Sequence, residues 1–218
     1  YPTGRSLRRY GCGLPVPACQ RGYGAVAAGG ENIQEGFTGA ASEAEIAVVK
    51  LKEAKDYLRK FYGIRQKAVC YQETDIVQGL RYLHLLALKN QKPLVMCVAL
   101  GTNLGGHNGM SSLSRILGSY SRLVDRCVVI GGGNEANERH HFQGKLNQVG
   151  EVQEVEMRVE SGNTGFVAEL WGTIPNIVTA YLISPSGERS PVISIRQGSR
   201  YQLTFPFEQT VVDVEYQL

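Results

Sequence analysis

The sequence lacks the features of several common classes of protein. No stretch of the 218 residues approaches the ~18 consecutive apolar residues that span a bilayer, which predicts a chain without a membrane helix. No C-x-x-C motif occurs, and the five cysteines have no close pair, so zinc and dithiol redox sites have little support. The first thirty residues contain no acid. Their arginines follow no helical pattern and few aromatic residues accompany them, which argues against nucleic-acid binding.

The bulk composition is that of an ordinary folded protein. Hydrophobic residues make up 43% of the chain and charged residues 20%, with a net charge of +3. The length fits one large domain or two small ones. The chain opens on a tyrosine and not on a methionine, which suggests a processed or cut piece of a longer protein.

Apolar strands alternate with amphipathic helices between residues 31 and 150. Each predicted strand is a mainly apolar run, and each predicted helix carries apolar residues at spacings of three and four. This alternation predicts an α/β fold, in which a parallel sheet is covered by helices on both faces. The predicted strands span residues 44–51, 94–100 and 127–130, and the predicted helices begin at Thr74 and at Ser111 or Ser112.

The pattern changes on either side of this region. Residues 1–30 are rich in glycine, proline and arginine and have no sustained period, which predicts an irregular segment. Residues 151–218 alternate apolar and polar side chains, for example at 155–159 and 201–207, which predicts antiparallel β-structure with one wet face. We therefore predict three parts: an irregular segment at 1–30, an α/β domain at 31–150, and a β-rich, sandwich-like module at 151–218.

The ends of two predicted strands provide the candidate site. Neighbouring parallel strands place their carboxyl ends at the same edge of a sheet, where α/β proteins build their sites. The loops that follow residues 94–100 and 127–130 should therefore face one crevice. Their residues are Leu100, Gly101, Thr102 and Asn103 in one loop, and Gly131, Gly132, Gly133, Asn134 and Glu135 in the other.

Residues 128–141, VVIGGGNEANERHH, allow two interpretations. In the first, a glycine-rich turn follows a buried strand and Asn134 stabilises that turn locally. In the second, the glycines let the backbone of a substrate come close, and Asn134 presents an amide at the end of the strand.

Three segments resemble the subtilisin-like serine proteases, or subtilases. Residues 129–136 resemble the subtilase block in which a buried strand ends in Gly-Gly-Asn-Glu and the asparagine donates to the oxyanion. Residues 98–101, VALG, resemble the strand that lines the substrate cleft, with Ala99 in place of the usual serine. Residues 36–50 resemble the segment that follows the catalytic histidine helix. The likeness is greatest to clostridial spore-germination-type subtilases, which carry a β-rich insert before their serine, as residues 151–218 would.

The resemblance implies a fold, an activity and a set of site residues. The fold would be an incomplete subtilisin-like α/β domain followed by the start of a β-rich insert, and the activity would be serine-type endopeptidase cleavage of a peptide or protein substrate. No cofactor is implied, and the sequence offers no support for a structural calcium ion. The location stays unknown, although the resemblance favours a bacterial, intracellular or spore-associated one over a membrane, and nothing is predicted for the oligomeric state. The implied oxyanion donor is Asn134, and the implied substrate-binding residues are Leu100, Gly101, Thr102, Gly131, Gly132 and Gly133.

The chain also departs from the subtilase pattern. The first aspartate is Asp56 and the first histidine is His84, both after the segment where the catalytic pair should lie, and neither H-G-T nor G-T-S occurs. A reading-frame error or a scrambled terminus within residues 1–30 would produce this. We therefore expect a fragment that keeps the oxyanion strand, lacks a recognisable catalytic Asp, His and Ser, and has no peptidase activity on its own.

Two other functions fit parts of the sequence. One is a pseudoprotease or peptide-binding module that keeps the cleft without the triad. The other is a nucleotide-binding α/β protein, because residues 22–27 match G-x-G-x-x-A, although no apolar strand precedes them. The remaining candidate residues have structural interpretations: His84 as a helix packing residue, Ser111 or Ser112 as a helix cap, and Cys97 and Cys127 as small core side chains.

Overall fold

The computed structural model describes residues 28–32, 36–65, 68–133, 137–159, 161–163, 165–193, 198 and 200–216. Residues 1–27 and Asn134, on which predictions were made above, lie outside the described residues. The chain divides into two compact units. The first consists of Tyr1–Leu104 and Gly109–Val167, and the second consists of Gly105–Asn108 and Ala168–Leu218.

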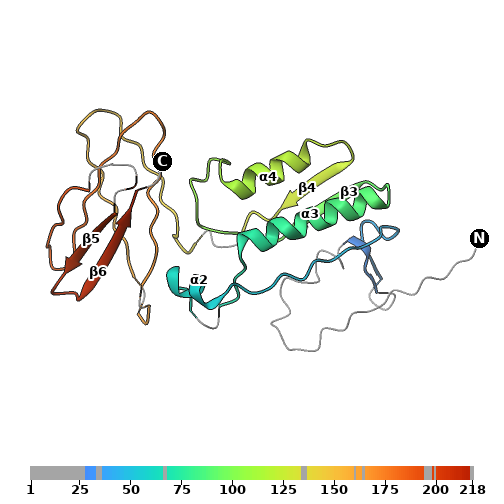
Figure 1. Cartoon of the computed structure of the whole chain (residues 1–218), viewed down its shortest axis with the longest axis horizontal. Helices are drawn as coiled ribbons and strands as arrows, with labels where there is room; N and C mark the ends of the chain where they lie inside the picture. The colour runs from blue at the N-terminus through green and yellow to red at the C-terminus, as the bar shows by residue number, and fades with distance from the viewer. Residues whose placement is uncertain are drawn as a thin grey trace, which may run out of the picture. The chain divides into compact units, whose positions relative to one another are not determined.

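The first unit contains a pair of parallel strands packed against helices. Strands β3 (Leu94–Val98) and β4 (Arg126–Ile130) pair in parallel along their whole length. Helix α3 (Glu73–Lys89) precedes β3, and helix α4 (Ser112–Ser121) connects the two strands; both lie along the pair (Figure 1). This is the strand–helix–strand crossover of an α/β fold, so the predicted fold class is confirmed.

The core of this unit lies between the helices and one face of the strand pair. Met96 is only 1% exposed, and it packs with Leu80 of α3, Val98 of β3 and Leu117 of α4. The three-and-four spacing of apolar residues along each helix turns one stripe toward the strands. The partly buried residues around this cluster are Ile76, Leu94, Leu100, Leu113, Tyr120 and Val128.

The opposite face of the strand pair is exposed. Successive side chains of a strand point to opposite faces, so Val95 and Cys97 point away from Met96 and Val98. Val95 is 67% exposed, and Cys97 and Cys127 are also exposed. The prediction that helices cover both faces is therefore wrong for these strands, and so is the interpretation of the two cysteines as core residues. A continuous apolar run predicts burial of both faces, but among the described residues the helices pack on only one.

The segment 44–51 was predicted as a strand and forms none. Its apolar side chains divide between α3 and solvent: Val49 and Leu51 lie close to Gly79, where an added Cβ would stand 3.1 Å from Val49 Cγ1, whereas Val48 is exposed. Packing beside the helix takes the place of the expected strand pairing.

The starts of the two long helices test the predicted caps. Ser111 is the N-cap of α4, and its hydroxyl accepts a hydrogen bond from the Ser114 backbone at 3.2 Å, as predicted. The N-cap of α3 is Gln72, so the prediction that Thr74 caps this helix is wrong by two residues. The Thr74 hydroxyl instead accepts a hydrogen bond from the Gln72 side chain at 2.6 Å.

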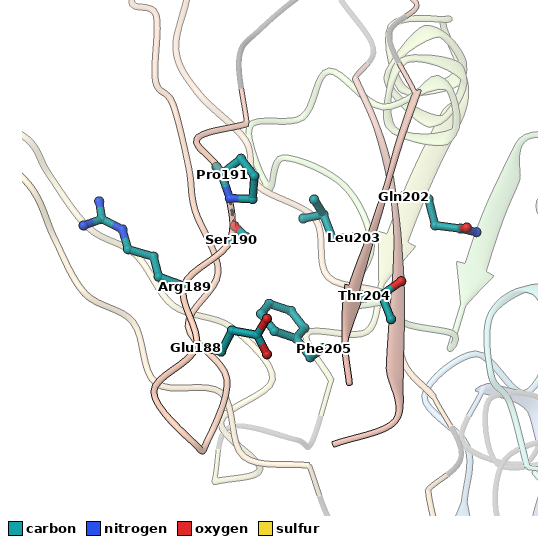
Figure 2. A pocket seen from close by; sticks show the side chains of 8 residues that line it. All are labelled: Glu188, Arg189, Ser190, Pro191, Gln202, Leu203, Thr204 and Phe205. Carbon is teal, nitrogen blue, oxygen red and sulfur yellow. Dashed lines mark hydrogen bonds between the residues drawn. The ribbon is translucent and has the colours of Figure 1, made fainter. Parts of the chain in front are cut away.

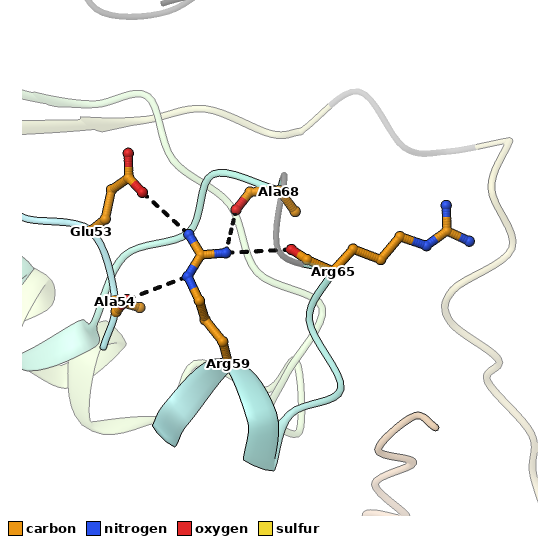
Figure 3. A network of polar contacts seen from close by, with 5 residues as sticks. All are labelled: Glu53, Ala54, Arg59, Arg65 and Ala68. Carbon is orange, nitrogen blue, oxygen red and sulfur yellow. Dashed lines mark hydrogen bonds and ion pairs between the residues drawn. The ribbon is translucent and has the colours of Figure 1, made fainter. Parts of the chain in front are cut away.

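A single arginine holds together the segment around the short helix α2 (Asp56–Phe61). Arg59 is 9% exposed, and its guanidinium donates to the carbonyl oxygens of Ala68 at 2.7 Å, Ala54 at 3.4 Å and Arg65 at 3.4 Å (Figure 3). It also pairs with the Glu53 carboxylate at 3.3 Å. The fork of five N–H donors explains how one side chain serves residues from 53 to 68.

The second unit is built around an antiparallel hairpin. Strands β5 (Arg200–Phe205) and β6 (Thr210–Glu215) pair from Arg200↔Glu215 to Phe205↔Thr210, and burial alternates along both. The predicted antiparallel structure with one wet face is confirmed for these residues. The alternating residues at 155–159 form no strand, and their side chains are exposed.

Two further strands, β1 (Glu31–Asn32) and β2 (Phe37–Thr38), form a short pair in the first unit.

Candidate functional site

The carboxyl ends of β3 and β4 lie side by side. The Gly131 N–H donates to the Val98 carbonyl oxygen at 3.1 Å, which extends the strand ladder one step past the last residue of β4. A Cβ added at Gly131 would stand 3.8 Å from the Ala99 Cα. The loops that follow the two strands therefore start next to each other, as the parallel arrangement predicted.

A side-chain contact joins the two loops again further along. The Asn103 Nδ2 lies 3.2 Å from the His140 Nδ1. With His140 neutral and its proton on Nε2, Asn103 donates this hydrogen bond. The sequence places Asn103 in the loop after residues 94–100 and His140 within residues 128–141, but it does not predict their contact, because residues in two loops have no common period that would reveal it.

The glycines of this edge leave their backbone accessible. Gly101, Thr102, Gly131, Gly132 and Gly133 are all exposed. A Cβ at Gly101 would meet nothing within 4 Å, so the space above this residue is open. Gly133 has φ +82°, a left-handed conformation that favours glycine. An extended peptide has room to approach the backbone here.

Two predicted substrate-binding residues have internal partners. The Leu100 side chain packs against the core, which leaves its backbone for contacts at the edge. The Thr102 hydroxyl accepts a hydrogen bond from the Leu104 N–H at 3.1 Å, which stabilises the turn that follows. The predicted oxyanion donor, Asn134, follows Gly133 directly in sequence but lies outside the described residues.

Other histidines and serines have structural roles or no assigned chemistry. The His84 Nδ1 accepts a hydrogen bond from Arg126 at 3.4 Å, and the His84 ring packs against Tyr120 at 5.1 Å, so this residue joins α3 to the strand and helix beside it. The Ser111 hydroxyl caps α4 and bonds the Ser114 hydroxyl at 2.8 Å. Both structural interpretations made from the sequence agree with these contacts.

The second unit contains a pocket of about 180 Å³. It lies between residues 188–191, which follow the turn at residues 185–186, and strand β5, and the Glu188 carboxylate points toward Phe205 (Figure 2). Arg189 extends away from the other labelled side chains and stacks on Tyr181, with its guanidinium carbon 3.6 Å from the ring centroid. The remaining lining residues are Ser190, Pro191, Gln202, Leu203, Thr204 and Phe205. The pocket contains none of the residues predicted to form the site.

The described residues contain neither a cluster of metal ligands nor a membrane-spanning helix. In the ranges that the structure describes, no three or more His, Cys, Asp or Glu side chains are grouped as metal ligands would be. In the same ranges no helix is both long enough and apolar enough to cross a bilayer.

The fold has a counterpart among solved structures. The structure of the Clostridium perfringens CspB protease matches this chain with a TM-score of 0.59 and 24% sequence identity, over 84% of this chain and 37% of that one. This chain has the fold of part of that protease. No family model and no curated protein matches the sequence.

The coverage and the sequence identity of this match limit the conclusion to the fold. The chain spans little more than a third of the length of the CspB protease, and at 24% identity the likeness establishes the fold alone. It is a mixed α/β fold, with a parallel strand pair packed on helices followed by antiparallel strands.

Proposed function

We propose that this chain provides the peptide-binding and oxyanion-stabilising part of a subtilisin-like serine endopeptidase. The observation that carries the proposal is the shared edge of β3 and β4, where Gly131 bonds Val98 and the exposed loops at Gly101 and Gly131–Gly133 begin side by side. A strand edge with open glycine backbone accepts an extended peptide through main-chain hydrogen bonds. The fold shared with part of a protease supports this choice over a nucleotide site.

Asn134 supplies the chemistry in this proposal. When a nucleophile attacks a peptide carbonyl, negative charge develops on the oxygen, and a preorganised amide donor binds that oxygen more tightly in the transition state than in the ground state. Removing one such donor costs about 2.7–4 kcal/mol of transition-state stabilisation in a serine protease. The place of Asn134 in the sequence supports this role, because it directly follows Gly133 in the loop that begins after β4 ends at Ile130.

The chain is assigned peptide binding without hydrolysis. Hydrolysis needs a serine, a histidine that takes its proton and an aspartate that orients the histidine. The structural roles of His84 and Ser111 support their exclusion from such a set. We expect no turnover of a fluorogenic peptide and no covalent labelling by a fluorophosphonate probe.

Peptide binding is tested by amide resonances of the isotopically labelled chain. Addition of a blocked hexa-alanine peptide should shift the resonances of Gly101, Thr102 and Gly131. Gly101→Ala should weaken binding about fivefold, because the added methyl group occupies the open space in which the peptide approaches and so prevents roughly one main-chain hydrogen bond to the peptide. Gly118→Ala is the matched control, since a Cβ at either glycine meets nothing within 4 Å. Equal effects of the two variants, or shifts confined to other residues, would contradict the proposed site.

A further inference from the structure

Part of the loop between β3 and α4 belongs to the second unit. The chain leaves β3 at Val98 and passes through the proposed peptide-binding residues to Leu104 in the first unit. Gly105–Asn108 then group with the unit that contains Ala168–Leu218. The chain returns to the first unit at Gly109, just before α4. The residues that hold Gly105–Asn108 therefore come from far along the sequence.

The holding contacts centre on one carboxylate oxygen. The Glu169 Oε2 accepts a hydrogen bond from the Gly105 N–H at 2.7 Å and another from the Trp171 Nε1–H at 3.0 Å. Hydrogen bonds to an ionised carboxylate are stronger than those between neutral groups, and 2.7 Å is at the short end of the range for N–H···O bonds. Glu169 therefore fixes both the backbone of the loop and the orientation of the indole.

The indole in turn covers the next residue of the loop. A Cβ added at Gly106 would stand 3.1 Å from the Trp171 Cδ2 and Cε3 atoms, which is closer than ordinary contact, so the ring lies directly on the glycine backbone. The loop also has an unusual backbone, because Gly105 has φ +97° and His107 has φ +49°. A non-glycine residue in the left-handed region persists when its surroundings hold it there.

We infer that Glu169 and Trp171 are positioning residues that set the conformation of the β3–α4 loop, and through it the peptide-binding residues Gly101 and Thr102. The inference rests on the proposed function for what Gly101 and Thr102 bind. It adds that residues of the β-rich part of the chain control the β3–α4 loop. The connection runs through the backbone, since only Asn103 and Leu104 separate Thr102 from the residue that Glu169 holds.

The contacts of Glu169 and Trp171 with Gly105 and Gly106 form a clasp on the loop, and the chain contains its own spectroscopic reporter for it. Trp171 is its single tryptophan, so its fluorescence and its indole N–H resonance report on one site without ambiguity. Glu169→Ala removes both hydrogen bonds. Glu169→Gln keeps one neutral acceptor oxygen and should therefore retain part of the hydrogen bonding to Gly105 and Trp171. Glu154→Ala is the matched control, because Glu154 is an exposed carboxylate outside the clasp.

The experiment compares these variants of the full chain by amide resonances, with and without the blocked hexa-alanine peptide. Glu169→Ala should shift the indole N–H of Trp171 and the amides of Gly101 and Thr102, and it should weaken peptide binding about fivefold. Glu169→Gln should give smaller shifts in the same directions, and Glu154→Ala should give none. A loss of far-UV circular dichroism in Glu169→Ala would transfer the test to Glu169→Gln.

Two failures can be told apart. If Glu169→Ala and Glu169→Gln shift the Trp171 indole resonance but leave the Gly101 and Thr102 resonances unchanged, the Glu169–Trp171 contacts exist without positioning the peptide-binding residues, and the inference is wrong. If the wild-type chain binds no peptide while the Gly101 and Thr102 resonances still follow Glu169, the proposed function fails and the positioning role stands. An unchanged Trp171 resonance in both Glu169 variants would show that the clasp does not form.

Discussion

Replacing Arg59 should destabilise the first unit more than any other single change of a charged side chain around α2. Arg59→Met removes the guanidinium and keeps most of the apolar stem. The hydrogen bond to Ala68 at 2.7 Å contributes about 1.5–3 kcal/mol, the range for bonds to charged groups. The contacts at 3.3–3.4 Å contribute less, and the Glu53 side chain is 58% exposed, which limits that ion pair to about 1 kcal/mol. We expect a total loss of about 2–4 kcal/mol.

The assay is urea unfolding followed by far-UV circular dichroism, together with amide hydrogen exchange across residues 53–71. Lys60→Met is the matched control, because Lys60 is the next residue of α2 and is exposed. Arg59→Lys should lose about half as much as Arg59→Met, since an ammonium keeps the charge but not the planar fork. The reasoning is refuted if Arg59→Met is no less stable than Lys60→Met, or if exchange accelerates evenly over the unit and not around residues 53–71.

Three further outcomes follow from single contacts. Met96→Ala should lower the free energy of unfolding by about 2–5 kcal/mol because it empties a fully buried site, whereas Val95→Ala, on the exposed face of the same strand, should change it little; denaturation of both variants checks this. Ser111→Ala should lower the free energy of unfolding by about 1 kcal/mol because it removes the cap of α4. Alanine in place of an exposed serine that caps no helix should cause no such loss in the same assay. Hydrogen bonds from the side chain and backbone of Ser186 hold the pKa of Glu208 below its usual value, so the stability that Glu208 contributes is present above the ordinary carboxyl pKa and is lost as the pH falls through the lowered one. Glu208→Gln should therefore reduce the fall of the melting temperature of the second unit with decreasing pH. An unchanged dependence of the melting temperature on pH would exclude this role.

The sequence predicts those parts of the fold in which local pattern and packing agree. The run at 94–100 and the helix that starts after Ser111 were predicted because apolar spacing and a capping hydroxyl specify them directly. The strand predicted at 44–51 fails because the same apolar pattern is satisfied by packing beside α3 at Gly79. Periodicity reports that a side chain is buried or exposed, but not which element covers it.

The candidate site divides in the same way. The meeting of the loops after Val98 and Ile130 follows from parallel pairing, which short apolar strands joined by a helix already predict. The contact between Asn103 and His140 leaves no trace in the sequence, because it depends on how two loops fold. The oxyanion role of Asn134 remains a prediction, since that residue lies outside the described part of the chain.

The discontinuity of the second unit limits how this protein can be cut or recombined. Because Gly105–Asn108 group with Ala168–Leu218, the polypeptide passes between the units at three junctions. A truncation after Val167 would remove the carboxylate that accepts the Gly105 N–H, and a graft of residues 168–218 onto another host would carry Glu169 and Trp171 without the glycines they hold. During folding, the later segment must close a long loop back onto the earlier one, and the entropy of that closure has to be offset by these contacts. Exchange of the β-rich part between relatives therefore requires the short β3–α4 loop to be exchanged with it.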